Sequence, residues 1–215
     1  MENRSLLIML RGAWVALTIT LLGLFIVGMG PRIHELSAVC SGDGCPLVAP
    51  SPAEAEVLQN AGFTLLQFAY LHQTFEVLVV GAMLAFSMVV LWVRSDDWFG
   101  ILVSFTIMMF GLNFMVEADN ALIQLYPRWR LPHDLMSATT AVLFILLLYL
   151  FPDGRFTPSF TKFTALILAI IAVIDSITQS TNQITETFGL TMMLAYIASL
   201  VLGMGAQIYR YRRIS

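Results

Sequence analysis

Six long apolar stretches constrain the fold of this sequence more than any other feature. A helix needs about 20 predominantly apolar residues to cross a bilayer, and backbone groups in hydrocarbon must be hydrogen-bonded within the protein. The stretches are too long and too uniformly apolar for the strands of a barrel. We therefore predict an all-α fold, a polytopic transmembrane helical bundle with about six spans. The predicted spans are residues 12–30, 75–93, 99–116, 135–151, 163–177 and 188–209.

The composition supports this class. Hydrophobic residues make up 58% of the chain and charged residues 12%, whereas soluble domains have roughly 45–50% and about 25%. The expected partner of so apolar a surface is the lipid bilayer, and residues 1–215 are expected to form a single membrane domain. A net charge of −3 with only eleven Lys and Arg excludes a nucleic-acid partner, which would require a basic face.

Basic residues set the predicted orientation, because Lys and Arg near membrane ends accumulate on the cytoplasmic side. With the N-terminus inside, eight basic residues are cytoplasmic and three are external, so both termini are predicted to be cytoplasmic. The cytoplasmic set is Arg4, Arg11, Arg94, Arg155, Lys162, Arg210, Arg212 and Arg213, and the external set is Arg32, Arg128 and Arg130. Trp14, Trp92 and Trp98 are then expected at the inner interface and Trp129 at the outer one.

The first apolar stretch is expected to remain in the protein as a helix. It is longer than the 7–15-residue core of a signal peptide, and no small-x-small cleavage site occurs near Pro31.

The longest hydrophilic stretch, residues 31–72, is predicted to be extracytoplasmic and contains both cysteines, Cys40 and Cys45. Their close spacing, with Gly42 and Gly44 between them, favours a local disulfide in an oxidising compartment. Metal binding is the alternative, but two thiols without further Cys or nearby His make a poor zinc site. No metal site is therefore predicted.

A helix is predicted to begin inside this loop. Ser51, Pro52 and Glu54 have the spacing of a capping box with proline in the first turn. The helix could run along the outer surface through Tyr70 and then bend or continue into the second span. Two interpretations remain open, an ordered cap over the bundle and a loop that reads a ligand.

Ionisable and amide side chains near the predicted outer membrane boundary are the candidate site residues: Glu76, His72, His133, Asn113, Glu117 and Asp175. His72 and Glu76 are four residues apart, and so are Asn113 and Glu117, so each pair shares a helix face. His133 opens the fourth span beside Asp134. These side chains could converge in a pocket for a ligand, a metal ion or a proton. They could equally be interfacial residues hydrated by water and headgroups.

The sequence contains no catalytic constellation. A Gly-rich phosphate loop, a Gly-x-Ser-x-Gly elbow and a His-Glu-x-x-His metal motif are all missing. All three histidines are predicted to be external, and the cytoplasmic loops are too short for a catalytic domain. We therefore expect no enzymatic activity and no cofactor.

Three stretches carry a more specific signal: Trp92–Trp98, which closes the second span, Tyr149–Pro158, which closes the fourth, and the terminal Gln207–Ser215. Together they resemble the N-terminal multi-pass membrane sensor region of bacterial sensor histidine kinases, over nearly the whole chain. The first two also have a simpler interpretation as loops and membrane anchors, because Pro152, Asp153 and Gly154 favour a helix stop and a turn.

This resemblance implies a sensory or signal-transducing domain of a bacterial plasma membrane. In that family the basic end leads to a phosphoacceptor helix and an ATP-binding domain, and no residue here matches either one. The chain would be a separated or truncated sensor domain, or a free-standing relative. The expected partners are a second copy of the chain in a homodimer and a cytoplasmic kinase module or response regulator. A subunit of a transporter or channel is the main alternative function, followed by an integral membrane enzyme.

Overall fold

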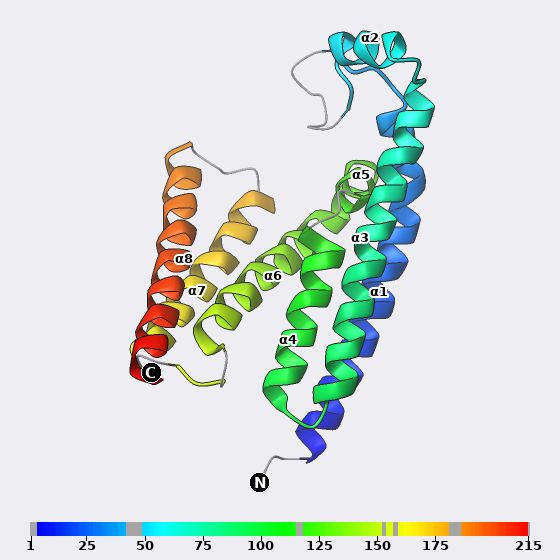
Figure 1. The fold of residues 1–215 in the computed structure, drawn as a ribbon. Coiled ribbons are helices and arrows are strands. Elements are labelled where there is room, and N and C mark those ends of the chain that lie inside the picture. Colours follow the sequence, from blue (N-terminus) through cyan, green and yellow to red (C-terminus); the bar gives the residue numbers. More distant parts are fainter. Residues whose placement is uncertain are drawn as a thin grey trace.

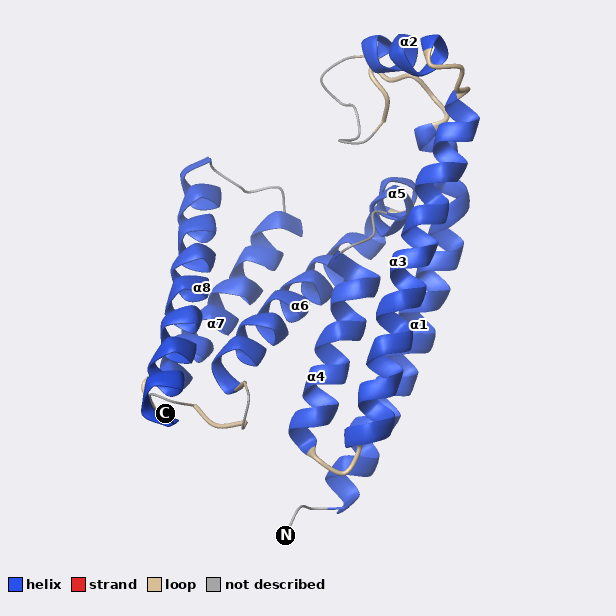
Figure 2. Cartoon of the chain, in the orientation of Figure 1, coloured by secondary structure: helices blue, strands red, loops and turns tan. Residues whose placement is uncertain are grey.

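The computed structural model describes residues 4–41, 49–114, 118–151, 154–156, 159–180 and 186–214, and no strand occurs among them. The helices are α1 (Arg4–Leu36), α2 (Pro52–Asn60), α3 (Leu65–Arg94), α4 (Trp98–Met109), α5 (Ala118–Leu125), α6 (Arg130–Leu150), α7 (Thr161–Ser180) and α8 (Glu186–Ile214). A π-helical turn, η1 (Phe110–Phe114), extends α4, and a 3₁₀ turn, η2 (Pro127–Trp129), precedes α6. The predicted all-α fold is confirmed (Figure 2).

Three helical segments in this part of the chain are long and apolar enough to cross a membrane: Arg4–Leu36, Leu65–Arg94 and Pro127–Leu150. Trp98–Asn113 and Met193–Tyr209 form shorter apolar helices. Several apolar helices are thus compatible with membrane insertion, while six spans and the orientation of the termini remain predictions.

The long helices alternate in direction (Figure 1). We call the end where α1 begins and α8 ends the inner end, and the end that carries α2 and α5 the outer end. Helices α1, α3 and α4 pack together, and α6 crosses beside α4 and separates it from α7 and α8 (Figure 1).

Helices α1 and α3 are longer than predicted. Helix α1 continues past Pro31 to Leu36, so its 33 residues span about 50 Å against a hydrocarbon thickness of about 30 Å. Helix α3 begins at Leu65, about ten residues before the predicted span. The segment between them is therefore shorter than the predicted loop 31–72, and both helices exceed the thickness of the hydrocarbon.

Between these two helices, the predicted helix start at Ser51 is confirmed. The Ser51 hydroxyl accepts from the Glu54 amide at 3.3 Å, and the Glu54 carboxylate accepts from the Ser51 amide at 2.9 Å. Helix α2 does not run on to Tyr70, because Gly62 adopts a φ of 82° and breaks the chain direction. A second capping box, at Thr64 and Gln67, starts α3.

The capping box makes α2 sensitive to acid. Hydrogen bonds from the Ser51 backbone amide and hydroxyl lower the pKa of Glu54 from its ordinary value of 4.5. Because the folded pKa is depressed, this stabilisation is present above pH 4.5 and is lost as pH falls through the folded value. We expect amide exchange in α2, corrected for intrinsic rates, to accelerate below pH 4.5. Glu54→Gln should remove that pH dependence and Glu56→Gln should keep it; a Glu54→Gln profile like that of wild type would contradict the assignment.

The cysteine loop is only partly described. The Cys40 amide donates to the Pro50 carbonyl at 3.1 Å and so closes the base of the loop. Cys45 lies outside the described residues, so the disulfide between Cys40 and Cys45 stays a prediction.

The core between α1, α3 and α4 contains Trp14, Leu21, Phe25, Val80 and Met108, all at most 4% exposed. The Trp14 ring faces neighbouring helices rather than the surface, so only its level at the inner interface stays a prediction. Trp92, Trp98 and Trp129 are exposed, as that prediction requires of the other three tryptophans.

Small residues let α3 and α4 approach closely. The Ser87 hydroxyl donates to the Ser104 carbonyl at 2.7 Å, and the Ser104 hydroxyl donates to the Ser87 carbonyl at 2.8 Å. A Cβ at Gly111 would lie 2.4 Å from the Met83 Cβ, and one at Gly100 would lie 2.4 Å from the Arg94 Cβ. Such contacts are typical of helix pairs in membranes.

Polar contacts connect the helices at the inner end. Arg11 of α1 donates to the Ser95 carbonyl and to the Asp96 carboxylate, the latter at 2.9 Å, and so fixes α1 to the α3–α4 turn. The Tyr149 hydroxyl of α6 donates to the Ser199 carbonyl of α8 at 3.1 Å. Gln207 of α8 donates to the Leu148 and Phe151 carbonyls at the end of α6.

Candidate functional site

Three polar residues of α3 form the first part of the site. Glu76 and Gln73 are 4% and 3% exposed, and the Gln73 amide donates to the Glu76 carboxylate at 3.2 Å. His72 is partly exposed, and its Nδ1 lies 3.6 Å from a Glu76 carboxylate oxygen. The predicted shared face of His72 and Glu76 is thus present in the structure.

Helix α1 supplies an ion pair that the sequence does not predict, in which the arginine is buried and the carboxylate is partly exposed. Arg32 is 1% exposed and donates to a Glu35 carboxylate oxygen at 2.7 Å. The other Glu35 oxygen accepts from Gln124 of α5 at 3.1 Å. The i,i+3 spacing of Arg32 and Glu35 is the signal for this pair, but the predicted first span ends at residue 30 and so leaves both residues in the loop.

The register of α1 against α3 places these two groups at similar depths. Helices α1 and α3 pack side by side in opposite directions (Figure 1), and Arg11 contacts the Ser95 carbonyl at their inner ends. Because both helices rise equally per residue, and because the Arg11 side chain itself spans about one helical turn, Arg32 on α1 is expected within about a turn of the level of Thr74 on α3. We call Arg32, Glu35, His72, Gln73 and Glu76 the outer polar cluster.

Burial of the outer polar cluster carries an unfavourable desolvation free energy. Each ion withdrawn from water costs several kcal/mol even after relaxation, and only close partners offset this cost. Arg32 and Glu35 have such partners in each other and in Gln124. The stability of the outer polar cluster therefore depends on its charged groups keeping their partners.

Asn113 belongs to a different contact, between η1 and α6. Its side-chain amide donates to Ser137 at 3.1 Å and to Thr140 at 3.2 Å, and its buried carbonyl oxygen has no partner among the described residues. The π-helical turn presents Asn113 to α6, and such turns often occur at functional positions. Glu117, the predicted neighbour of Asn113, lies outside the described residues.

His133 occupies a third location, in the first turn of α6. Its Nδ1 lies 3.3 Å from the Asp134 carboxylate, and the Arg130 side chain lies 4.0 Å from the same carboxylate group. His133 also lines a small, mostly apolar hollow. The other lining residues are Leu24, Leu122, Ile123, Trp129, Pro132 and Met136, none of which belongs to α3.

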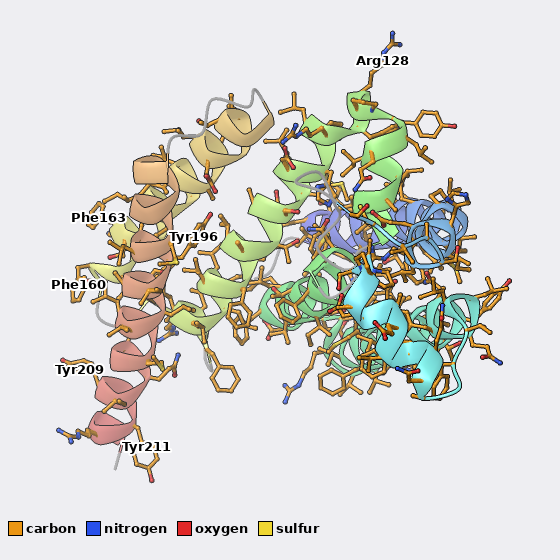
Figure 3. All side chains as sticks on the ribbon, turned by 90° about the horizontal axis from the view of Figure 1, so that it is seen from above. Arg128, Phe160, Phe163, Tyr196, Tyr209 and Tyr211 are labelled. Atoms are coloured by element: carbon orange, nitrogen blue, oxygen red, sulfur yellow. The ribbon has the colours of Figure 1, made fainter. Side chains whose placement is uncertain are left out.

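Asp175 lies on α7 and interacts electrostatically with Tyr196 of α8. Figure 3 shows Tyr196 among α6, α7 and α8, on the side of α6 away from α1 and α3. The structure therefore brings His72 and Glu76 together but distributes Asn113, His133 and Asp175 over other helix contacts. These residues do not share one pocket as the sequence had suggested.

No group of three or more His, Cys, Asp or Glu side chains that could hold a metal ion occurs within the described part of the chain. The chemistry available to the outer polar cluster is hydrogen bonding, ion pairing and proton exchange.

No protein-family model, no curated protein and no solved structure matches this chain. The resemblance to the membrane region of sensor histidine kinases accordingly stays a prediction.

Proposed function

We propose that the chain is a membrane-embedded sensory and signal-transducing domain without catalytic activity of its own. The observation that carries this proposal is the outer polar cluster, which places a buried arginine with its ion partner and a buried carboxyl group on the two helices that flank the outer segment with α2. Ionisable groups at membrane depth are expensive, and in membrane proteins they commonly mark sites of function.

The contacts of α6 support a route from this cluster to the inner end. Asn113 connects η1 to α6 near the outer end, and Gln207 connects the inner end of α6 to α8. Helix α8 then ends in the basic segment that includes Arg212. A displacement of α3 and α4 could therefore reach the C-terminal segment through contacts of fixed geometry.

The same proposal includes the orientation and the partners. Both ends of the chain would lie in the cytoplasm of a bacterium, since basic residues are concentrated at the inner end. The output would pass to a cytoplasmic kinase module or a response regulator, with a second copy of the chain in a homodimer.

A chimera tests the proposal. The chain would be fused after Ile214 to the phosphoacceptor and ATP-binding domains of a bacterial sensor kinase, and autophosphorylation would be measured in membranes. We expect Glu76→Gln to change kinase output, because it replaces the buried Glu76 carboxyl group by an amide that can be neither ionised nor protonated. Glu56→Gln makes the same chemical change on the exposed face of α2 and should have no effect. Equal output from wild type and Glu76→Gln would contradict the sensory function.

A transporter or channel subunit is the second candidate, and η1 is the observation that favours it. Substrate and ion sites of transporters are often built at interrupted helices, and Asn113 faces α6 from such an interruption. Ion or solute flux into proteoliposomes that is lost in Asn113→Leu would favour transport over signalling.

A further inference from the structure

Two of the sequence motifs, Trp92–Trp98 and Tyr149–Pro158, meet at the inner end of the structure. The first contains the α3–α4 turn and the second follows the inner end of α6 (Figure 1). A Cβ built at Gly154 would lie 3.1 Å from Cζ2 of the Trp98 ring and 3.5 Å from the Phe99 Cβ. The backbone at Gly154 therefore lies against the first residues of α4.

Position 154 requires glycine for two separate reasons. Its φ of 70° lies in the left-handed region, which residues with a Cβ adopt only at a cost in free energy. In addition, the Trp98 ring leaves little room for a Cβ. Gly62 also has a positive φ, of 82°, but a Cβ there would meet nothing within 4 Å. The close approach to α4 is therefore a property of the turn at Gly154 and not of every positive-φ glycine.

The same turn contacts the other group of helices two residues later. Phe156 packs against a buried apolar cluster between α6 and α7, and Tyr196 of α8 joins this cluster. The buried members are Ile145, Tyr149, Ala165 and Leu168. The short segment Gly154–Phe156 thus contacts α4 at one end and the core of α6 and α7 at the other.

Hydrogen bonds hold both sides of this contact. The Gly154 amide donates to the Leu150 carbonyl at 2.8 Å, which attaches the turn to the end of α6. On the other side, Arg11 of α1 donates to the Ser95 carbonyl at 3.1 Å and so holds the α3–α4 turn. A continuous series of contacts therefore leads at the inner end from α1, through the start of α4, to α6 and α7.

These contacts have little room to yield. Packed interiors are dense and transmit displacements, and coupling between sites is carried by packed side chains and hydrogen bonds. A shift of the Trp98 ring toward Gly154 meets backbone, which no change of rotamer can move.

We propose that the segment Gly154–Phe156 is a relay that couples the position of the first turn of α4 to the packing of α6 and α7. The relay rests on the proposed function for its purpose, since it gives a displacement of α1, α3 and α4 a route to the C-terminal helices at the inner end. Its physical content is a coupling between two turns, which is reciprocal and is measured without any signalling output.

The test is hydrogen–deuterium exchange, followed by mass spectrometry, of the full chain in lipid nanodiscs. Arg11→Gln releases the α3–α4 turn and should lower the protection of residues 164–170 in α7 by about 2- to 30-fold, the range expected for couplings through packed contacts. Gly154→Ala pushes against Trp98, so it should lower the protection of residues 101–107 in α4 by a similar factor.

Trp98→Ala removes the ring and should interrupt the relay. In that background, Arg11→Gln should leave the protection of residues 164–170 unchanged. Trp92→Ala is the matched control, because it makes the same change at a side chain that is 85% exposed; Arg11→Gln should keep its effect there. Gly62→Ala is the control for Gly154→Ala, because it introduces the same backbone strain without a close contact, and it should leave residues 101–107 unchanged.

Unchanged protection of residues 164–170 in Arg11→Gln, or of residues 101–107 in Gly154→Ala, would overturn the proposal. So would an effect of Arg11→Gln that persists in full in the Trp98→Ala background, because the displacement would then travel by another route. A chimera whose kinase output ignores Glu76→Gln would contradict the sensory function and leave these exchange patterns as they are, so the two failures are distinguishable.

Discussion

Replacing Arg32 by Met should destabilise the protein by about 1–3 kcal/mol, because it leaves the partly buried Glu35 carboxylate without its ion partner. Arg32 is 1% exposed and contacts Glu35 at 2.7 Å, while the Glu35 side chain is 12% exposed, so water compensates only in part for the missing guanidinium. Methionine fills a similar length of side chain without a charge, so the loss of stability reports mainly on the missing guanidinium. The free energy of unfolding in mixed micelles, obtained from a denaturant titration, measures the change.

Arg128→Met is the control for this variant, since it makes the same chemical change at an exposed position and should alter stability by less than about 0.5 kcal/mol. A double variant with Glu35→Gln should recover part of the loss, because it removes the unpaired carboxylate. A loss below about 1 kcal/mol in Arg32→Met would show that the ion pair is not essential to the packing of α1.

Gly111→Ala should cost about 1–3 kcal/mol, the usual range for overpacking. The new Cβ would lie 2.4 Å from the Met83 Cβ, an atom next to the backbone that a change of rotamer cannot move. Helices α3 and α4 would have to separate, and the reciprocal hydrogen bonds between Ser87 and Ser104 would lengthen. The same denaturant titration measures this change.

Gly81→Ala is the matched control on α3. A Cβ at Gly81 meets nothing within 4 Å, so the substitution should stabilise the helix by about 0.5–1 kcal/mol. Opposite signs for the two glycines would confirm the close approach of α3 and α4. Equal effects would mean that the helices are further apart than described.

Much of the fold could be predicted from local sequence signals. Long runs of apolar residues indicate helices, because the backbone groups in a bilayer must form hydrogen bonds within the protein. The capping box at Ser51 is visible in the sequence because it involves only Ser51 and Glu54. The shared face of His72 and Glu76 follows from helix periodicity in the same way.

The remainder depends on contacts between helices, which a single sequence does not specify. A proline such as Pro31 normally ends a helix, but α1 continues past it. Arg32 can then form its ion pair with Glu35, and Glu35 also accepts a hydrogen bond from Gln124 of α5. The Trp14 side chain has an apolar ring and a polar N–H group, so it suits either a membrane interface or a protein core. Its burial between helices follows from the positions of its neighbours. The separation of Asn113, with its partners on α6, from Glu76 likewise arises from tertiary packing.

The most direct test of the proposed coupling is a distance measurement between the inner ends of α3 and α8 in lipid nanodiscs. Spin-labelled unnatural residues at Val93 and Ile208, both exposed, leave Cys40 and Cys45 untouched. If the outer polar cluster controls the C-terminal segment, the distance distribution for Glu76→Gln should differ from that of wild type, and that for Glu56→Gln should not. Identical distributions for wild type and Glu76→Gln would contradict the coupling and leave the cluster with a role in stability alone.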